Sequence, residues 1–446
     1  MTTQPAVPLE LDDIQAPVLH PRPTRYAGAV ILARIDDRRD GRELLRRLID
    51  FVPSASDPPH PDRSAWASVA LSFQGLKALG VPDDTLAGFP QEFQQGMAAR
   101  AAELGDTGES APEHWESPLG SPDVHVVIYA LAPDAESLEA TLAGARDALR
   151  EIPGVAPIWL QDTYMLPNER TSFGFKDGIS HPAIEGSGIP GTNPREEPFK
   201  AGEFILGYPN ENGELPPMPQ PEVLGRNGTY VVFRKLQTRV AAYRQYIRSR
   251  AETPADEELL AAKFVGRWPS GAPLVLAPER DESELGADPG RNNAFLFAAD
   301  GDARGLKCPL GAHARRTNPR DSAISGIARN HRMIRRSSSY GPMLPKDVLE
   351  DDGADRGILF FCLQARLAQQ FEFVKTQWIN DGTFFGTPAE MDPFAGPNDG
   401  TGRFTIPQQP IRRRLTELPQ FVVNRGGEYC FMPGLRALRW LAALDT

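Results

Sequence analysis

The chain has 446 residues, of which 40% are hydrophobic and 24% charged, and its net charge is −11. This balance is typical of a globular protein with one large core or two linked cores. The acidic charge argues against nucleic acid or an anionic membrane as the main partner, and no apolar run reaches membrane-spanning length. The three cysteines, Cys308, Cys362 and Cys430, are too few and too widely spaced for a disulfide framework, which favours a cytoplasmic setting.

Residues 1–24 are rich in proline and are expected to form an extended N-terminal arm, available for contacts in a homo-oligomer. They lack a basic region followed by an apolar stretch, so no export signal is expected. Across residues 25–185, strand-like runs alternate with helical patterns. Strands are expected at 27–35, 66–73, 124–132 and 155–165, and helices at 41–51, 75–80 and 136–150. This β-α-β-β-α-β order is that of a ferredoxin-like, or split βαβ, unit.

Residues 186–227 are rich in Gly, Pro and Asn and are expected to form a long connecting loop. The second half, residues 228–446, repeats the first half's pattern less clearly. Its expected strands are 229–236, 357–363 and 428–432, and its expected helices are 257–264, 366–379 and 435–444. Residues 281–343 are expected to be mostly irregular. The sequence therefore predicts an α+β fold.

The segment from Thr171 to Pro182 places one carboxylate, Asp177, between Gly174 and Gly178. Glycines let the backbone turn sharply and approach a flat ligand closely. Asp177 is thus suited to act as an acid/base group above a cofactor face. The alternative is an Asx-type turn, in which the carboxylate bonds only its own backbone, and the motif alone favours this alternative.

The run from Cys308 to Arg320 holds one histidine, His313, between a Gly-containing turn and a cluster of arginines. A neutral imidazole is a good iron ligand, and guanidinium groups suit the carboxylates of a haem. From Arg304 to Arg336 there are nine basic residues and a single acid, Asp321, which predicts a local anionic ligand. The alternative is a solvated basic loop.

Taken together and in this order, the two segments resemble the dye-decolourising peroxidases, a haem peroxidase family. Gly174 to Gly178 matches its Gly-x-x-Asp-Gly motif, His313 lies in its Cys-Pro-x-Gly-x-His-x-Arg context, and Arg335 stands five residues before Tyr340. Stretches at 227–236, 266–274 and 357–373 are similar too. The resemblance covers most of the chain and suits the longer branch of the family. The chain departs from the pattern at residues 337–339, where three serines replace the usual run with a proline.

The resemblance implies two ferredoxin-like halves in a dimeric α+β barrel-like arrangement, with one haem b per chain held in the second half. It implies that His313 is the axial ligand of the iron, and either Asp392 or Glu372 would accept a hydrogen bond from the other ring nitrogen. It also implies Asp177 as general base and then acid, with Arg335 assisting O–O heterolysis through ferryl intermediates. Because Asp177 must be ionised to accept a proton, an acidic pH optimum is expected.

The remaining site expectations also depend on the resemblance. Arg315, two residues after the ligand, is expected to pair with a haem propionate. Ile179 and His181 are expected to line the haem edge. Leu359 and Phe361 alternate on one face of an expected strand and are assigned to an apolar distal wall, although ordinary core packing is equally compatible with them.

The expected activity is reduction of hydrogen peroxide with oxidation of dyes, phenolic compounds or other aromatic donors. A haem-binding or iron-releasing protein, similar to a deferrochelatase, is the alternative. Such a protein needs His313 but neither Asp177 nor Arg335, so the joint presence of these two residues favours catalysis. A cargo role within a protein shell would need a docking tail, and none is evident after residues 435–444.

Overall fold

A computed structural model describes residues 8–23, 25–57, 65–322, 328–384, 386 and 389–444. In the first half, four strands and three helices follow one another as β1 (Ala27–Ile35), α2 (Arg38–Ile49), β2 (Trp66–Ser72), α3 (Phe73–Leu79), β3 (Val126–Ala132), α6 (Ala135–Glu151) and β4 (Val155–Tyr164). The predicted β-α-β-β-α-β order is confirmed. Asp37 and Asp134 cap α2 and α6 by accepting backbone N–H groups, which sets where these helices begin.

The second half contributes β5 (Thr229–Thr238), α8 (Val240–Arg250), α9 (Pro254–Val265), β6 (Ile334–Arg335), β7 (Ser338–Tyr340), β8 (Gly357–Gln364), β9 (Gly402–Ile406), β10 (Arg413–Leu418), β11 (Val422–Met432) and α12 (Leu435–Ala442). Helix α8 and the β9–β10 hairpin were not predicted. The helix expected at 366–379 is π-helical, as η8 (Ala368–Glu372) and η9 (Val374–Ile379). Residues 281–343 are mostly irregular, as predicted.

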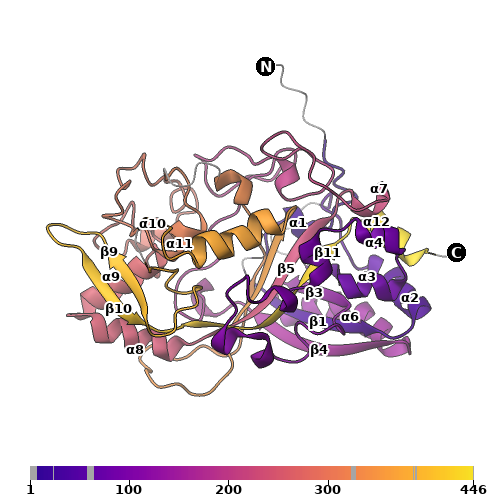
Figure 1. The fold of residues 1–446 in the computed structure, drawn as a ribbon, viewed down its shortest axis with the longest axis horizontal. Helices are drawn as coiled ribbons and strands as arrows, with labels where there is room; N and C mark the ends of the chain where they lie inside the picture. Colours follow the sequence, from indigo (N-terminus) through magenta and orange to yellow (C-terminus); the bar gives the residue numbers. More distant parts are fainter. Residues whose placement is uncertain are drawn as a thin grey trace.

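Short helical segments fill the connections. They are α1 (Ala16–Leu19), α4 (Asp83–Ala87), α5 (Gln91–Gln95), α7 (Glu222–Gly225), α10 (Ser283–Ala287) and α11 (His313–Thr317), with several 3-10 turns. In Figure 1, α2, α3 and α6 gather at one end of the molecule, whereas α8, α9 and the β9–β10 hairpin lie at the other.

Nine of the strands join in one sheet with the order β4-β1-β3-β2-β11-β5-β8-β6, in which β7 pairs with β8, and β9 and β10 form a separate two-stranded sheet. Within this sheet, each half has the same arrangement: its last strand (β4 or β11), then its first (β1 or β5), then strands that lie between these two in the sequence. The pairing of β2 with β11 connects the halves. Strand β4 also contacts β7, so the ends of the strand order meet and the sheet curls into a barrel.

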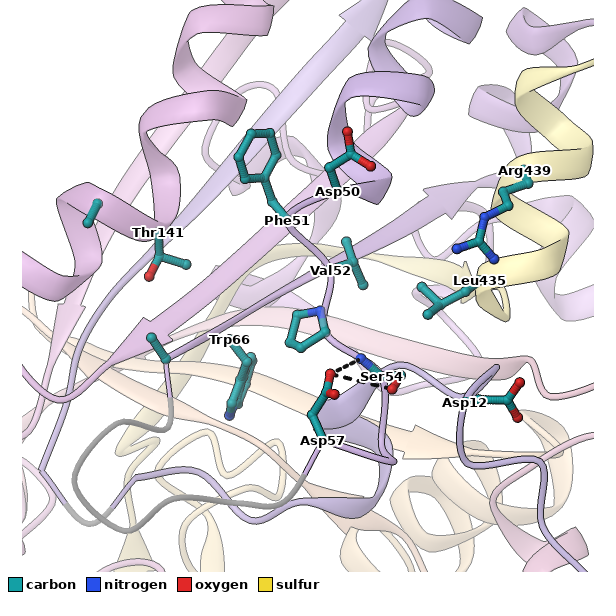
Figure 2. Close-up of a pocket in the computed structure, with 13 residues that line it drawn as sticks. Asp12, Asp50, Phe51, Val52, Ser54, Asp57, Trp66, Thr141, Leu435 and Arg439 are labelled. Atoms are coloured by element: carbon teal, nitrogen blue, oxygen red, sulfur yellow. Dashed lines mark hydrogen bonds between the residues drawn. The ribbon is translucent and has the colours of Figure 1, made fainter.

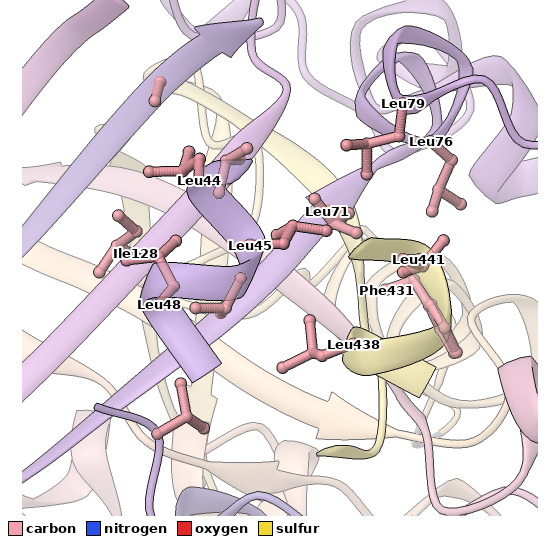
Figure 3. Packing of buried hydrophobic residues seen from close by; sticks show 14 of the residues in the cluster. Leu44, Leu45, Leu48, Leu71, Leu76, Leu79, Ile128, Phe431, Leu438 and Leu441 are labelled. Atoms are coloured by element: carbon pink, nitrogen blue, oxygen red, sulfur yellow. The ribbon is translucent and has the colours of Figure 1, made fainter. Parts of the chain in front are cut away.

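Period-two alternation along the strands divides the core in two. On β1, Ala29, Ile31 and Ala33 belong to the cluster beneath the helices, and Val30 and Leu32 belong to the cluster inside the barrel. Figure 3 shows the first cluster, in which leucines of α2 and α12 pack onto β2 and β11. This double burial makes the barrel a rigid base for the loops that carry the site.

The segment predicted to be an extended N-terminal arm is packed against the barrel from residue 8 onward; residues 1–7 and 24 lie outside the described part of the chain. Ile14, Val18 and Leu19 are buried in the inner cluster. The amide of Gln15 donates to the carbonyls of Val69 and Pro433, at 2.9 and 2.8 Å. The prediction was wrong for residues 8–23, because the apolar residues among the prolines supply enough buried surface to dock the segment.

Candidate active site

Asp177 lies in a tight loop after β4. Gly174 and Gly178 have φ angles of +92° and +76°, which residues with a side chain rarely adopt. The Asp177 amide donates to the carbonyl of Glu169 at 2.9 Å, and the Lys176 amide donates to the carbonyl of Pro269 at 3.1 Å. The loop is therefore fixed against the segment that follows α9, and the direction of the Asp177 side chain is set by this backbone.

The Asp177 carboxylate lies between two arginines. Its Oδ2 accepts a hydrogen bond from Arg22 Nη2 at 2.6 Å, and its Oδ1 accepts one from Arg335 Nη2. The side chain is only 9% exposed. Burial raises the pKa of Asp177, but the charges of Arg335 and Arg22 outweigh burial and bring the pKa far below its usual range. Asp177 is thus a buried, ionised carboxylate, and the alternative of a purely backbone-bonded Asx turn does not apply.

Arg22 is a site residue that the sequence reasoning missed. It lies 155 positions before Asp177, in a segment that was interpreted as an arm. Its guanidinium stacks over the ring of Tyr26, with 4.9 Å to the centroid. No short motif marks it, and only the path of the N-terminal segment brings it to the loop.

His313 is the first residue of α11, and its ring is oriented by a carboxylate. His313 Nδ1 lies 2.9 Å and 3.1 Å from the two carboxylate oxygens of Asp392. Asp392 Oδ1 also accepts the amides of Phe394 and Ala395, both at 2.9 Å, and the side chain is fully buried. Burial lowers the pKa of His313, but Asp392 reverses this effect and raises it overall.

Of the two carboxylates left open by the sequence, the structure therefore places Asp392 at His313. Glu372 lies elsewhere: it pairs with Arg100 and accepts a hydrogen bond from Tyr429 Oη at 2.8 Å. The Nδ1–Asp392 contact fixes the proton on Nδ1 and leaves the lone pair on Nε2 for a metal. The His313 side chain is 38% exposed, and the part of the chain that the structure describes places no hydrogen-bond partner at Nε2.

His313 and Arg335 lie close enough for the charge of Arg335 to lower the pKa of His313. The Arg335 side chain is 41% exposed although it holds Asp177. An exposed, carboxylate-oriented imidazole near an exposed guanidinium fits a haem iron on the imidazole side and a small polar ligand on the guanidinium side.

Arg315 does not have the position expected of a propionate partner. Its side chain and that of Asp302 are both 0% exposed and lie 3.1 Å apart. Its guanidinium also donates to the carbonyls of Cys308 and Asp302 and stacks over Phe297. The expectation does not fit because the Arg315 guanidinium is fully buried and is already occupied by Asp302 and the Cys308 carbonyl, so that it stabilises the loop before α11.

Leu359 and Phe361 are also core residues rather than a distal wall. Both belong to the cluster inside the barrel, and Phe361 stacks on Tyr129 with ring centroids 4.3 Å apart. Arg335 pairs with Cys362 across β6 and β8, and directly opposed residues share one face of a sheet. The face shared with Arg335 therefore carries Cys362 and the half-buried Phe360. The strand was predicted correctly, and Leu359 and Phe361 lie on its face toward the barrel interior, opposite to the face that carries Cys362.

Ile179 and His181 continue from the Asp177 loop. Ile179 is half-buried and packs near Gly271. His181 is buried; burial and the charges of Arg336 and Arg332 lower its pKa to about 3, so that it is neutral at ordinary pH. Its Nδ1 accepts a hydrogen bond from Arg336 at 3.4 Å. The structure thus brings both residues next to Asp177 and a group of buried arginines.

The serine run where the chain departs from the family pattern forms β7. Ser338, Ser339 and Tyr340 pair with β8, and the Ser339 amide donates to Tyr26 Oη at 3.0 Å. Burial raises the pKa of the Cys308 thiol, in the same motif as His313, to about 12, so this cysteine is a neutral thiol at ordinary pH.

A separate depression of about 600 Å³ lies on the surface at the other end of the molecule. Figure 2 shows it between the end of α2 and α12, with Phe51, Trp66, Leu435 and Arg439 among its lining residues. None of the residues named for the candidate active site lines this depression.

A curled α+β barrel that brings a carboxylate-backed histidine near an arginine-paired aspartate defines an oxidoreductase of the haem peroxidase class. The family model described as "DyP dimeric alpha+beta barrel domain" matches residues 54–152. Peroxidase 2 of Mycetinis scorodonius is 31% identical over 405 residues, which cover 83% of this chain and 75% of that protein. The chain belongs to the dye-decolourising peroxidase family and is a peroxidase.

Other comparisons agree over nearly the whole length. The multifunctional dye peroxidase DyP2 of an Amycolatopsis species is 31% identical, covering 97% of this chain and 96% of that protein. A dye-decolorizing peroxidase solved in complex with 2,6-dimethoxyphenol superposes with a TM-score of 0.85 at 27% identity, covering 98% of this chain and 100% of that one. Among the residues that the structure describes, no helix is long and apolar enough to cross a membrane.

Proposed function

We propose that the chain binds one haem b, with His313 Nε2 on the iron, and uses hydrogen peroxide to oxidise phenolic and dye-like donors. A bound haem supplies the iron that accepts peroxide and the two electrons that its O–O cleavage consumes. The observation that carries the proposal is the pair of oriented groups: His313 fixed by Asp392, and the ionised Asp177 in contact with Arg335. The phenol bound to one solved relative supports phenols as a donor class.

The residues of this chain move the proton. Asp177, ionised by its arginines, takes a proton from hydrogen peroxide and returns it to the oxygen that leaves as water. Arg335 stabilises the negative charge on that departing oxygen. Over one turnover, two donors each give up an electron and a proton, so that one peroxide is reduced to two waters.

We assign the haem propionates to Arg332 and Arg320 in place of Arg315. Arg332 donates to Ser180 Oγ at 3.0 Å, beside Ile179, and its nearest acid, Glu196, is 4.0 Å away. Arg320 donates to the carbonyl of Asn293 at 3.1 Å and stacks over Phe295, but it is only partly buried, whereas Arg315 is fully buried against Asp302. Burial, together with the neighbouring Arg267 and Arg332, lowers the pKa of Arg320 to about 9. Like charges on two partly buried arginines favour an anionic ligand, and two propionates would supply it. Ile179 and His181 then line the haem edge.

The test is the absorption spectrum of the haem-loaded protein before and after hydrogen peroxide. We expect His313→Ala to lose the axial-histidine spectrum, Asp177→Asn to bind haem but react with peroxide about 100-fold or more slowly, and the exposed-histidine control His114→Ala to match wild type. A wild type that binds haem but does not react with peroxide would favour the haem-carrier alternative. Failure to bind haem would overturn both.

The deferrochelatase of Yersinia pestis is 26% identical, over 58% of this chain. A haem carrier has no use for a buried carboxylate held ionised by two arginines, so the distal geometry favours catalysis. A cytoplasmic setting belongs to the same proposal and is supported by the three free, buried cysteines. Fractionation of cells that express the chain would test it.

A further inference from the structure

The N-terminal segment from residue 8 to residue 22 is held at both ends of its path along the barrel. Its first part is anchored near the last helix, where the Arg436 amide donates to Asp13 Oδ1 at 2.6 Å. Its later part is held by Arg336, which donates to the carbonyl of Pro17 at 2.7 Å and, more weakly, to those of Val18 and Leu19. Arg336 follows Arg335 in the sequence, so these hydrogen bonds hold the segment directly beside Arg335.

These contacts hold the Arg22 side chain in one position against Asp177. The guanidinium is 10% exposed, and its Nη2 reaches Asp177 Oδ2 at 2.6 Å. A Cβ atom at position 178 would lie 3.1 Å from the same Nη2, so the glycine of the motif also makes room for Arg22. Arg335, in contrast, has a 41% exposed side chain on the other carboxylate oxygen.

We propose that Arg22 is a positioning residue of the peroxide-activating site, which anchors Oδ2 of Asp177 and leaves Oδ1, next to the half-exposed Arg335, as the atom that exchanges the proton. The inference rests on the proposed function. Thus Oδ2 holds the side chain in position, and Oδ1 takes part in proton transfer. Because the anchor is itself cationic, it also helps to keep the carboxylate ionised in acid.

The charged and titratable groups around Asp177 are consistent with this role. Arg335 and Arg22 contact the carboxylate, and both lower the pKa of Asp177. Beyond them lie Arg336 and the neutral His181, which add no competing acid. Burial lowers the pKa of Arg22, but Asp177 and the neighbouring Tyr26 and Tyr129 raise it overall, so Arg22 stays charged. Loss of Arg22 would leave Asp177 with one cation instead of two.

The test uses Arg22→Gln, the charge-keeping Arg22→Lys, and the matched control Arg25→Gln, which makes the same change at an exposed arginine three residues further along the chain. In the haem-loaded protein, the rate of reaction with peroxide is followed by stopped-flow absorption from about pH 3 to about pH 8. Because two arginines hold the pKa of Asp177 far below its usual range, wild type should keep its rate down to the acid end of this window. Since one neighbouring arginine lowers a carboxyl pKa by about one to three units, Arg22→Gln should bring an acid limb into the measured range. Arg22→Lys should remove most of that limb again, and Arg25→Gln should behave like wild type.

A second readout needs neither haem nor turnover. Denaturant unfolding of the haem-free chain is measured over the same pH range for wild type, Asp177→Asn, Arg22→Gln and the double variant. A carboxyl whose folded pKa is lowered adds stability that is present above its unfolded pKa and is lost as the pH falls. The stability change caused by Asp177→Asn should therefore depend on pH when Arg22 is present, and should depend on pH less strongly once Arg22 is replaced by glutamine.

Two results would overturn the inference: an acid limb of Arg22→Gln that coincides with wild type, or stability effects of Arg22→Gln and Asp177→Asn that are additive at every pH. A failed proposed function would look different. The wild type itself would then be unreactive with peroxide, while the haem-free unfolding series would still report whether Arg22 and Asp177 are coupled.

Discussion

Replacing Asp392 by asparagine should weaken haem binding although it changes the side chain by one atom. In wild type, the Asp392 oxygens accept the Nδ1–H of His313 at 2.9 and 3.1 Å and the amides of Phe394 and Ala395. An asparagine oxygen can keep the two amides, but its NH₂ group then faces Nδ1. The favoured tautomer places the proton on Nε2, where it blocks the lone pair that would bind iron.

The magnitude follows from the contacts that are lost. A hydrogen bond to a charged partner contributes about 1.5–3 kcal/mol, which corresponds to about one to two pKa units of the imidazole. We therefore expect the pKa of His313 in the haem-free protein to fall by that amount. Haem affinity should fall about 10- to 100-fold, the usual effect of removing the hydrogen-bond partner of a metal-binding histidine.

The assay is titration of haem into the haem-free chain, followed by absorption, with Glu372→Gln as the matched control. Glu372 is the other carboxylate that the sequence allowed, and it pairs with Arg100 rather than His313. The control should bind haem like wild type. Equal haem affinity and an unchanged axial-histidine spectrum in Asp392→Asn would refute the reasoning, as would a loss in Glu372→Gln alone.

Three further changes have definite expected results. Arg315→Met should destabilise the haem-free chain by about 3–5 kcal/mol in denaturant, because it leaves the buried Asp302 unpaired; intact stability with lost haem affinity would restore the propionate role. Phe361→Ala should lower stability by about 3–5 kcal/mol, whereas Phe360→Ala should mainly change the haem spectrum and the peroxide rate, and the reverse pattern would contradict the assignment of strand faces. Burial raises the pKa of Glu428 to about 7 from 4.5, so stability falls as the pH rises between those values. Glu428→Gln should thus match wild type at about pH 4 and be more stable by roughly 3 kcal/mol at about pH 8, as measured by unfolding, and an equal difference at both pH values would contradict this.

Features that depend on local sequence were predictable. Strand β1 has the bounds that its apolar run indicated, and the caps and acids of α6 set its start within one residue of the expectation. The fold class followed because the β-α-β-β-α-β order is legible in the first half. The motifs around Asp177 and His313 were found because each lies within one short stretch of the chain.

Features that depend on distant parts of the chain were not predictable in the same way. Which face of β8 meets Arg335 is set by its register with β6, and a period-two pattern that is apolar on both faces does not reveal it. Arg315 and Arg320 look alike in sequence, and only the path of the loops shows which one is paired with Asp302. Arg22 was missed because its partner, Asp177, lies 155 positions further along the chain.

The path of the N-terminal segment also has a consequence for the order in which the protein can mature. Gln15 bonds to Pro433 across 418 positions, and Asp13 bonds to Arg436 across 423. On a ribosome, the segment that carries Arg22 emerges early, but these two contacts form only after β11 and α12 have been made, and contacts of such high order form slowly. The full docking of the N-terminal segment is therefore among the last steps of folding.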